Sequence, residues 1–283
     1  MKFTKMQGIG NDYVYINCFE ETVKNPSRLS IQVSDRHFGV GSDGLILILP
    51  SKVADCCMDM YNADGSRAEM CGNGIRCVAK YVYDHKIVEK EELKIETLNG
   101  VKEVRLTVKN GKAVLATINM GQPELRPERI PALFSGESVV SQPISVDGKE
   151  YNVTCVSMGN PHAVVYMEEL ENLDLERIGP AFEYHKKFPN RVNTEFIQVI
   201  DRSHLKMRVW ERGSGETLAC GTGACASAVA TVLNGKADTT VDIELKGGHL
   251  TIEWNEKDRC VYMTGAAEEI YNGELNDEIF KEE

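Results

Sequence analysis

The sequence predicts an α/β fold of the α+β type, built from two related, strand-rich halves, and three observations support this class. Short runs of alternating apolar and polar residues are joined by turn residues in both halves, as in antiparallel hairpins. Two stretches stand apart as helical, residues 75–83 and 224–233. Each follows the pattern Cys-Gly-x-Gly, at 71–74 and 220–223, an offset of 149 residues (220 − 71). This repeat indicates a duplicated unit.

The clearest strands are predicted in hairpins towards the end of each half. Residues 104–108 alternate apolar and polar side chains, Asn110-Gly111 supplies a two-residue turn, and the chain returns over 113–118. Three runs in the second half repeat this pattern: 241–245, 250–254 and 260–263. The helix at 224–233 consists of small and apolar residues on every side, so we expect it inside its half.

The duplication extends beyond the two helices. The same offset takes Gly10-Asn11 to Gly159-Asn160, and it takes Asn62 to Glu211, each of which follows an apolar strand. Two polar positions that obey the offset of the cysteine motifs strengthen the case for two equivalent halves.

Turn-forming residues at 121–123 mark the predicted boundary between the halves. We expect a first half at 1–120, which contains the Cys71 loop, and a second at 121–265, which contains the Cys220 loop. The C-terminal tail, residues 266–283, is expected to pack back on the first half.

Composition excludes several classes of protein. The 283 residues carry a formal charge of -11, so no broad cationic surface is available for nucleic acid or anionic membranes. No uncharged apolar run approaches the roughly 18 residues of a membrane-spanning helix, and the run at 45–50 has the length of a buried strand. Nine cysteines follow a start without a secretory signal, which predicts reduced thiols and a cytoplasmic location.

Each Cys-Gly-x-Gly segment is predicted to join a strand to a helix, with the cysteine sulfur at the helix N-terminus. The glycines leave backbone N–H groups unobstructed, which makes an anion site beside a thiol and favours the reactive thiolate. Two such junctions that face each other would hold one carboxylate and place a sulfur on each face of the adjacent carbon. This geometry suits inversion of an amino-acid α-carbon by two bases, one ionised and one protonated.

Backbone amides that hold the carboxylate would also stabilise the carbanion that forms when the proton leaves. A cofactor would otherwise serve as the electron sink, and we find no convincing pyridoxal phosphate site, so no cofactor is expected.

The remaining cysteines are interpreted as structural. Core packing or incidental exposure accounts for five of them: Cys18, Cys56, Cys57, Cys155 and Cys260. Cys77 and Cys225 lie one to two turns into the predicted helices, where small side chains pack, and their spacing from Cys71 and Cys220 is unusual for zinc. No metal site is expected, although the cysteine count keeps a zinc-binding or redox-sensing thiol protein as an alternative from a different class.

Several segments together carry a resemblance to a known enzyme family. They are Gly8-Ile9-Gly10-Asn11-Asp12, Gly39-Val40-Gly41-Ser42-Asp43-Gly44, Asn62-Ala63-Asp64-Gly65-Ser66, Cys71-Gly72-Asn73-Gly74-Ile75-Arg76-Cys77, Gly159-Asn160-Pro161-His162, Arg191-Val192-Asn193, Glu211-Arg212-Gly213 and Ala219-Cys220-Gly221-Thr222-Gly223. Over nearly its whole length the chain resembles the diaminopimelate epimerases, cofactor-independent enzymes of lysine and peptidoglycan precursor synthesis. Proline racemases and phenazine-type isomerases look similar in fold, but the Glu-Arg-Gly segment favours the epimerases, so a proline-type racemase is the alternative among enzymes.

The resemblance implies two mirrored halves, each a strand-rich cone or barrel-like sheet around a central helix. It implies that Cys71 and Cys220 act as alternating base and acid in the epimerisation of LL-2,6-diaminopimelate to meso-2,6-diaminopimelate. Relatives of this kind are typically homodimers.

The resemblance also implies a set of substrate-binding residues. Those expected at the reacting carboxylate are Gly72, Asn73, Gly221 and Thr222. Those expected to orient or recognise the rest of the zwitterion are Asn11, Asn62, Asn160, Asn193, Glu211 and Arg212. A guanidinium suits a carboxylate and a carboxylate suits an ammonium, in keeping with Arg212 and Glu211.

Two residues are expected to adjust the ionisation of the sulfurs, His162 and Glu211. Without the resemblance, His162 would be interpreted as structural, and His37 and His85 receive no role. Gly44 departs from the family, because some relatives carry a glutamine there that contacts substrate. That contact is expected to be absent or supplied by backbone or water, so Gly44 is left out of the site.

Overall fold

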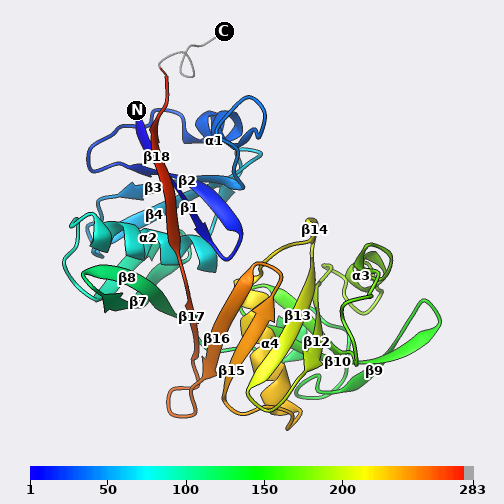
Figure 1. Ribbon diagram of the computed structural model, residues 1–283. Helices are drawn as coiled ribbons and strands as arrows, with labels where there is room; N and C mark the ends of the chain where they lie inside the picture. The colour runs from blue at the N-terminus through cyan, green and yellow to red at the C-terminus, as the bar shows by residue number, and fades with distance from the viewer. Residues whose placement is uncertain (277–283) are drawn as a thin grey trace. The chain divides into compact units, whose positions relative to one another are not determined.

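The computed structural model describes residues 1–276, and the chain divides into two compact units (Figure 1). Unit 1 comprises residues 1–118 together with the described residues from 265 to 276, and unit 2 comprises residues 119–264. The last part of the expected tail, residues 277–283, lies outside the described residues. Among the described residues, none of the helices combines the length and apolar character that crossing a membrane needs.

The described part of unit 1 is a mixed sheet with two helices, and the predicted α/β class is confirmed. Its strands are β1 (Lys2–Gly8), β2 (Asn11–Asn17), β3 (Gly44–Leu49), β4 (Cys56–Asn62), β5 (Arg67–Ala68), β6 (Glu92–Thr97), β7 (Gly100–Lys109), β8 (Lys112–Asn119) and β18 (Glu268–Glu274), and its helices are α1 (Pro26–Ser34) and α2 (Gly72–Asp84). β3 reads Gly-Leu-Ile-Leu-Ile-Leu and is buried along nearly its whole length, as expected for a central strand that is covered on both faces.

Unit 2 has the same kind of sheet and the same number of α-helices. Its strands are β9 (Gln142–Val146), β10 (Lys149–Ser157), β11 (Pro161–Tyr166), β12 (Asn193–Val199), β13 (His204–Glu211), β14 (Gly215–Glu216), β15 (Thr240–Leu245), β16 (Gly248–Trp254) and β17 (Val261–Gly265), and its helices are the 3₁₀ turn η1 (Pro127–Arg129), α3 (Leu175–Glu183) and α4 (Gly221–Leu233). Its core contains Phe182 and Phe196, whose rings meet edge to face at 5.5 Å.

The two units repeat one connectivity. In unit 1 the parallel pairs β2–β3 and β4–β6 are bridged by α1 and α2, and in unit 2 the parallel pairs β11–β12 and β13–β15 are bridged by α3 and α4. Cys56 of β4 pairs with Ile95, and Leu205 of β13, 149 residues later, pairs with Ile243. The pseudo-symmetry expected from the sequence therefore extends to individual strand pairs.

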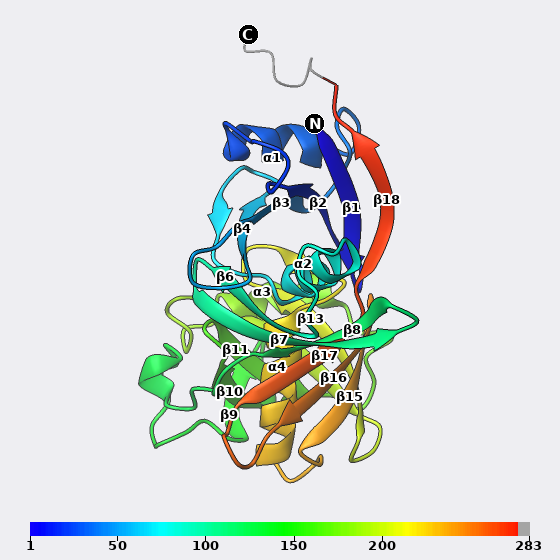
Figure 2. The same ribbon diagram turned by 90° about the vertical axis from the view of Figure 1, so that its left-hand side faces the viewer.

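The strand at one edge of the sheet comes from a neighbouring segment in unit 2 but from the C-terminal part of the chain in unit 1. In unit 2, β9 pairs with the following strand β10, whereas in unit 1 the equivalent place beside β1 is taken by β18 (Figure 2). The Thr4 hydroxyl donates to Asn272 at 2.5 Å, and the rings of Phe3 and Tyr271 meet at 6.0 Å. The chain thus returns to unit 1 after it has formed unit 2.

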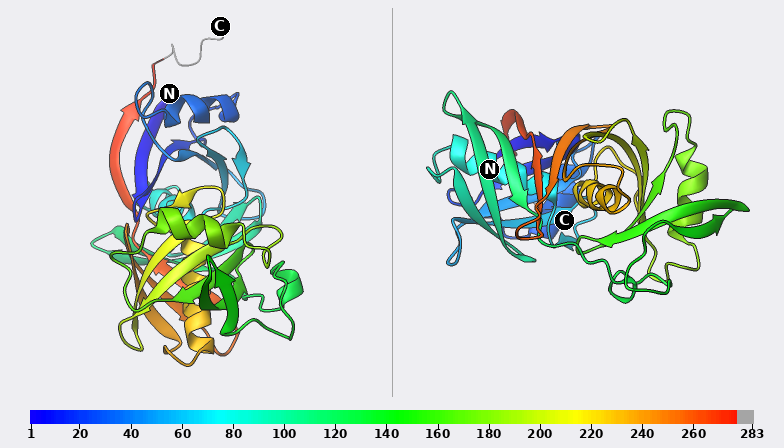
Figure 3. Two further views of the ribbon diagram at one scale, coloured as in Figure 1. Left: turned by 90° about the vertical axis from the view of Figure 1, so that its right-hand side faces the viewer. Right: turned by 90° about the horizontal axis from the view of Figure 1, so that it is seen from below.

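α2 and α4 are the central helices of their units and confirm the two predicted helical stretches. α4 contacts β10, β11, β12, β15 and β16, and its side chains are small and almost all buried, so the strands approach it closely (Figure 3). Its composition of Gly, Ala, Ser and Cys matches that environment. The predicted hairpins are also confirmed, as β7–β8 and β15–β16–β17.

The sequence interpretation did not identify α1 and α3. Each has nine residues and begins at a side-chain cap, Asn25 for α1 and Asp174 for α3. α3 also contains Pro180. Helices this short show little apolar periodicity, and an internal proline argues against a helix, so local signals are weak and packing on the sheet decides the structure.

Candidate active site

The N-terminal turn of α2 presents the sulfur of Cys71. Cys71 is the N-cap residue, with extended backbone angles of φ -127 and ψ 121, and its Sγ accepts the N–H of Gly74 at 3.4 Å. The sulfur lies 3.2 Å from Oδ1 of Asn11 and donates to it. A cysteine therefore caps the helix, where serine or aspartate is common, and the helix dipole favours negative charge on its sulfur.

A charged cluster fixes the orientation of Asn11. Its Nδ2 donates to Oδ2 of Asp43 at 2.8 Å, so its carbonyl oxygen faces Cys71. Arg36 bridges Asp43 at 3.0 Å and Asp12 at 3.2 Å, and Lys5 pairs with Asp12. Burial raises the pKa of the Asp43 carboxyl. Burial of Asp12 acts in the same direction, but Lys5 and Arg36 together outweigh it, so the pKa of Asp12 is lowered.

The N-terminal turn of α4 repeats this arrangement in unit 2. Cys220 is the N-cap, with φ -125 and ψ 105, and its Sγ accepts the N–H of Gly223 at 3.4 Å. The hydroxyl of Thr222 lies 3.6 Å from the sulfur. Burial raises the pKa of the Cys220 thiol, and the carboxylate of Glu211, or of Glu195 when it is ionised, raises it further, while the hydrogen bonds from Thr222 and Gly223 lower it.

His162 belongs to a buried hydrogen-bond chain beside Cys220. Its Nε2 lies 3.0 Å from Oδ1 of Asn160, and Nδ2 of Asn160 donates to Thr222 Oγ1 at 3.2 Å. Its Nδ1 lies 2.7 Å from Oε1 of Glu195, and both side chains are fully buried. These hydrogen bonds connect His162 to the Thr222 hydroxyl, which lies next to the Cys220 sulfur.

Glu195 was missed by sequence reasoning. It stands on β12 in the run Asn-Thr-Glu-Phe-Ile, directly after the Arg-Val-Asn motif. A glutamate directly before the apolar pair Phe-Ile of a buried strand is a signal that could have found it, because buried carboxyl groups are rare without a partner.

A second group of predicted residues holds the turn after β13. The side-chain oxygen of Asn193 accepts the backbone N–H of Arg212 at 2.9 Å, and its Nδ2 donates to Pro161 O at 2.9 Å. The Arg212 guanidinium donates to Asn190 O at 3.1 Å, and Glu211 accepts the Thr217 hydroxyl. Asn193 therefore ties the starts of β11 and β12 to the Glu-Arg-Gly segment.

The structure distributes the predicted residues over both units. Unit 1 contains Asn11, Asn62, Cys71, Gly72 and Asn73, and unit 2 contains Asn160, His162, Asn193, Glu211, Arg212, Cys220, Gly221 and Thr222. Gly72 and Gly221 begin their helices directly after the cysteines. Asn73 is buried and its Oδ1 has no hydrogen-bond partner, whereas Asn62 ends β4 and donates to Ser66 at 3.0 Å.

The structure shows why position 44 is glycine in this chain. A Cβ at Gly44 would lie 2.1 Å from the carbonyl oxygen of Tyr61 and 2.8 Å from the Tyr13 ring. The start of β3 therefore has no room for the glutamine side chain expected in some relatives, unless strand β4 shifts.

Seven cysteines of the described chain are free thiols: Cys18, Cys56, Cys57, Cys77, Cys155, Cys220 and Cys260. Burial raises the pKa of Cys56 to about 12 and that of Cys77 to about 11, so these thiols are poor nucleophiles. Within residues 1–276, no group of three or more His, Cys, Asp or Glu side chains is arranged to hold a metal ion.

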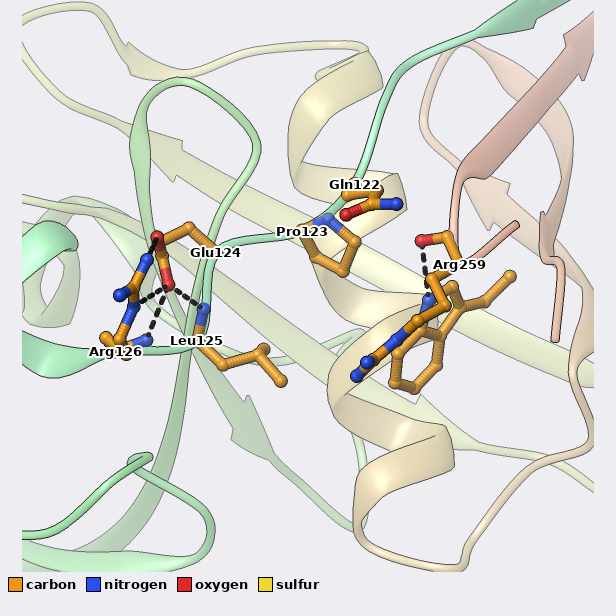
Figure 4. Close-up of a pocket in the computed structure, with 7 residues that line it drawn as sticks. Gln122, Pro123, Glu124, Leu125, Arg126 and Arg259 are labelled. Carbon is orange, nitrogen blue, oxygen red and sulfur yellow. Dashed lines mark hydrogen bonds and ion pairs between the residues drawn. The ribbon is translucent and has the colours of Figure 1, made fainter. Parts of the chain in front are cut away.

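A cavity of about 360 Å³ in unit 2 is lined by none of the predicted site residues (Figure 4). Its lining residues are Gln122, Pro123, Glu124, Leu125, Arg126, Trp254 and Arg259. Glu124 binds Arg126 through two hydrogen bonds of 2.9 and 2.7 Å, and the Trp254 indole N–H donates to Arg259 O at 3.2 Å. Glu124 and Arg126 neutralise each other, and we assign the cavity no role in the chemistry.

Comparison of the structure with solved structures places the fold in a known class. The chain is similar to a hydroxyproline epimerase of Agrobacterium vitis, with a TM-score of 0.69 at 15% identity over 96% of this chain and 91% of that one. It is also similar to a phenazine biosynthesis protein of Bacillus anthracis, with a TM-score of 0.68 at 15% identity over 98% and 99%. The chain therefore has the fold that this epimerase and this phenazine biosynthesis protein share.

Sequence comparison identifies the family within that class. The family model for diaminopimelate epimerase matches residues 3–126 and 154–270. Diaminopimelate epimerase of Acetivibrio thermocellus is 58% identical over 98% of this chain and 99% of its own length, and that of Methanococcus maripaludis is 56% identical over 98% and 100%. The chain belongs to the diaminopimelate epimerase family.

Proposed function

We propose that this protein epimerises LL-2,6-diaminopimelate to meso-2,6-diaminopimelate without a cofactor, in the synthesis of lysine and peptidoglycan precursors. The observation that carries the proposal is the cysteine at the N-cap of the central helix in each unit of a chain that belongs to this family. The curated relatives at 49–58% identity bear the name of this activity.

The proposed chemistry is a proton transfer at one α-carbon. A thiolate removes the α-proton, so that the C–H bond breaks and an S–H bond forms. The opposite thiol gives its proton to the other face, so that a new C–H bond forms and a thiolate remains. The two sulfurs exchange roles, the total charge is unchanged, and no oxidant or reductant is needed.

The negative charge that develops on the substrate carboxylate requires stabilisation. The first backbone N–H groups of a helix have no partner within the helix, and Gly72, Asn73, Gly221 and Thr222 supply such groups next to the sulfurs. At the second amino-acid centre, Arg212 is proposed to bind the carboxylate and Glu211 the ammonium. Asn11, Asn62, Asn160 and Asn193 complete the proposed recognition set, and His162 and Glu211 adjust thiol ionisation.

The proposal extends to the setting of the enzyme. We propose that it acts in the cytoplasm, because its proposed chemistry needs two reduced cysteines. We also propose that it is a homodimer, as its resemblance to the family implies. Sedimentation equilibrium in reducing buffer tests the dimer, and a monomer at assay concentration with full activity would contradict it.

The test is turnover in D₂O by the wild type and by the Cys71→Ala and Cys220→Ala variants. The wild type should place deuterium at the inverted α-carbon, and each variant should lose at least about 10³-fold in kcat, since each lacks one of the two proton-transfer groups. Near-normal activity of either variant would refute the two-base assignment. Proline serves as the competing substrate, because it lacks the second ammonium and carboxylate, and preferential racemisation of proline would favour the alternative enzyme.

A further inference from the structure

A fully buried carboxyl group lies next to the Cys220 sulfur, and the proposed chemistry does not use it. Glu195 has no exposed surface, and its Oε2 has no hydrogen-bond partner. A Cβ placed on Gly223 would lie 2.6 Å from Glu195 Oε1 and 3.1 Å from Cys220 Sγ. The carboxyl group and the thiol therefore approach the same point beneath the first turn of α4.

The contacts of His162 define where protons lie. Nε2 faces Asn160 Oδ1, which can only accept, so Nε2 carries a hydrogen. Nδ1 faces Glu195 Oε1 at 2.7 Å, so these two atoms share one proton. Burial raises the pKa of Glu195 although His162 acts in the opposite sense, and an ionised carboxylate with one bare oxygen is costly in this environment. The arrangement fits a neutral carboxylic acid that donates to Nδ1.

The position of this proton determines the direction of each hydrogen bond between His162 and the Cys220 sulfur. The Nε2–H group donates to Asn160 Oδ1, which turns the amide nitrogen of Asn160 to Thr222 Oγ1. Because the Thr222 oxygen accepts that bond, its own hydrogen is free to point to Cys220 Sγ at 3.6 Å. A neutral Glu195 thus aligns a donor on the sulfur and also avoids placing a second negative charge beside a thiolate.

Among the described residues of unit 1, no equivalent of this pair lies beside Cys71. At the corresponding position below Gly74 stands Ile46, and a Cβ on Gly74 would meet its Cδ1 at 2.7 Å. Asn11, the counterpart of Asn160, is oriented by Asp43 directly and turns its carbonyl oxygen to Cys71. A buried acid therefore lies below the first turn of α4, where α2 has an isoleucine.

We propose that Glu195 is a positioning residue for His162: a buried carboxylic acid that shares one proton with the imidazole and so aligns the hydrogen bonds that end on the Cys220 sulfur. The inference rests on the proposed catalytic role of Cys220. The other titratable groups that face the pair are Glu211 from β13, Cys155 from β10 and Cys220 itself.

The experiment measures the rate at which iodoacetamide alkylates Cys220 between pH 6 and 10, without substrate, by peptide mass mapping. Cys71 in the same molecule is the internal control. Two variants are compared with wild type: Glu195→Ile, which installs the residue that fits in unit 1, and Glu195→Gln, which is neutral and can donate an N–H to His162 Nδ1.

In the Glu195→Ile variant, alkylation of Cys220 at neutral pH should slow by about tenfold, the loss expected when a hydrogen bond to a charged group is removed, while Cys71 is unaffected. The Glu195→Gln variant should retain most of the wild-type rate at neutral pH. In this variant the pH dependence of the Cys220 alkylation rate should follow a single ionisation, that of the thiol. In the wild type it should extend over two coupled steps, because the Glu195–His162 pair also loses its shared proton at high pH.

An unchanged Cys220 rate in the Glu195→Ile variant would overturn the inference, and so would a Glu195→Gln variant as slow as Glu195→Ile, because an ion pair would then be required. If Glu195→Ile does not fold, ¹⁵N-histidine spectra of wild type and Glu195→Gln decide: a neutral ring protonated at Nε2 is expected in both, and a wild-type imidazolium at neutral pH would contradict the inference. Alkylation does not depend on turnover, so loss of the proposed epimerase activity and loss of this inference are separate results.

Discussion

At the scale of single residues, the two asparagines beside the sulfurs face opposite ways. Asn11 turns its amide nitrogen to Asp43 and its carbonyl oxygen to Cys71, so that the Cys71 thiol acts as a donor. Asn160 turns its carbonyl oxygen to His162 and its amide nitrogen to Thr222. In both cases a carboxyl group determines the orientation, directly in unit 1 and through an imidazole in unit 2.

Removal of the carboxyl group in unit 1 should therefore act through Asn11. For Asp43→Ala we expect kcat to fall by about tenfold, with a smaller change in KM, because Asn11 loses the charged partner that holds it against Cys71. Steady-state kinetics measure the effect. Arg36→Ala is the matched control, since it removes the guanidinium that pairs with Asp43 but leaves the hydrogen bond between Asn11 and Asp43. An equal loss of kcat in both variants would show that charge, and not orientation, is responsible.

At the scale of elements, the first turns of α2 and α4 share one geometry but rest on different neighbours. Each begins at a cysteine N-cap whose sulfur accepts an N–H three residues later. A Cβ added to Gly74 of α2 would contact the flexible end of Ile46. A Cβ added to Gly223 of α4 would contact the Glu195 oxygen that is hydrogen-bonded to His162. The equivalent glycines of the two helices should therefore differ in how well they tolerate a larger side chain.

Gly223→Ala should destabilise the protein more than Gly74→Ala. The gain in helix propensity is equal in both and cancels, but the new methyl group at 223 lies 2.6 Å from a fixed oxygen while the one at 74 lies 2.7 Å from a methyl group that can rotate away. We expect a difference of about 1–3 kcal/mol in the free energy of unfolding, measured by urea titration. Equal destabilisation would show that the carboxyl group moves as easily as the methyl group.

At the scale of the whole molecule, unit 1 depends on a strand made after unit 2. β18 pairs with β1 along its length, and Leu275 returns to the N-terminus, where its N–H donates to Met1 O at 2.8 Å. Unit 2 is one continuous segment of chain, whereas unit 1 is completed only when the C-terminal strand β18 pairs with β1.

A chain that ends at Ala266 should therefore lose unit 1 while unit 2 stays folded. Both tryptophans, Trp210 and Trp254, lie in unit 2, so their fluorescence reports that unit alone. We expect the fluorescence-detected Tm to change little and the circular dichroism signal to drop at all temperatures. Loss of both signals together would show that the units fold as one.

Much of the architecture was accessible from sequence because it rests on local and periodic signals. The Cys-Gly-x-Gly repeat located both central helices, and the Asn110-Gly111 turn located the β7–β8 hairpin, in which both turn residues have positive φ. α1 and α3 lacked such signals. Within the site, the motifs located the cysteines, but no periodicity shows which way an asparagine amide turns.

The sequence by itself determined the duplicated strand-rich fold, the cysteine at the start of each central helix and the family resemblance, since each is written in residue types at fixed spacings. The tertiary structure decides which side chains meet: the Glu195–His162 contact joins β12 to β11, and the Asn11–Asp43 contact joins the start of β2 to the residue before β3, 32 positions later. The physical reason is that hydrogen-bond direction and burial depend on neighbours brought together by strand pairing, and these neighbours set the charge beside each sulfur.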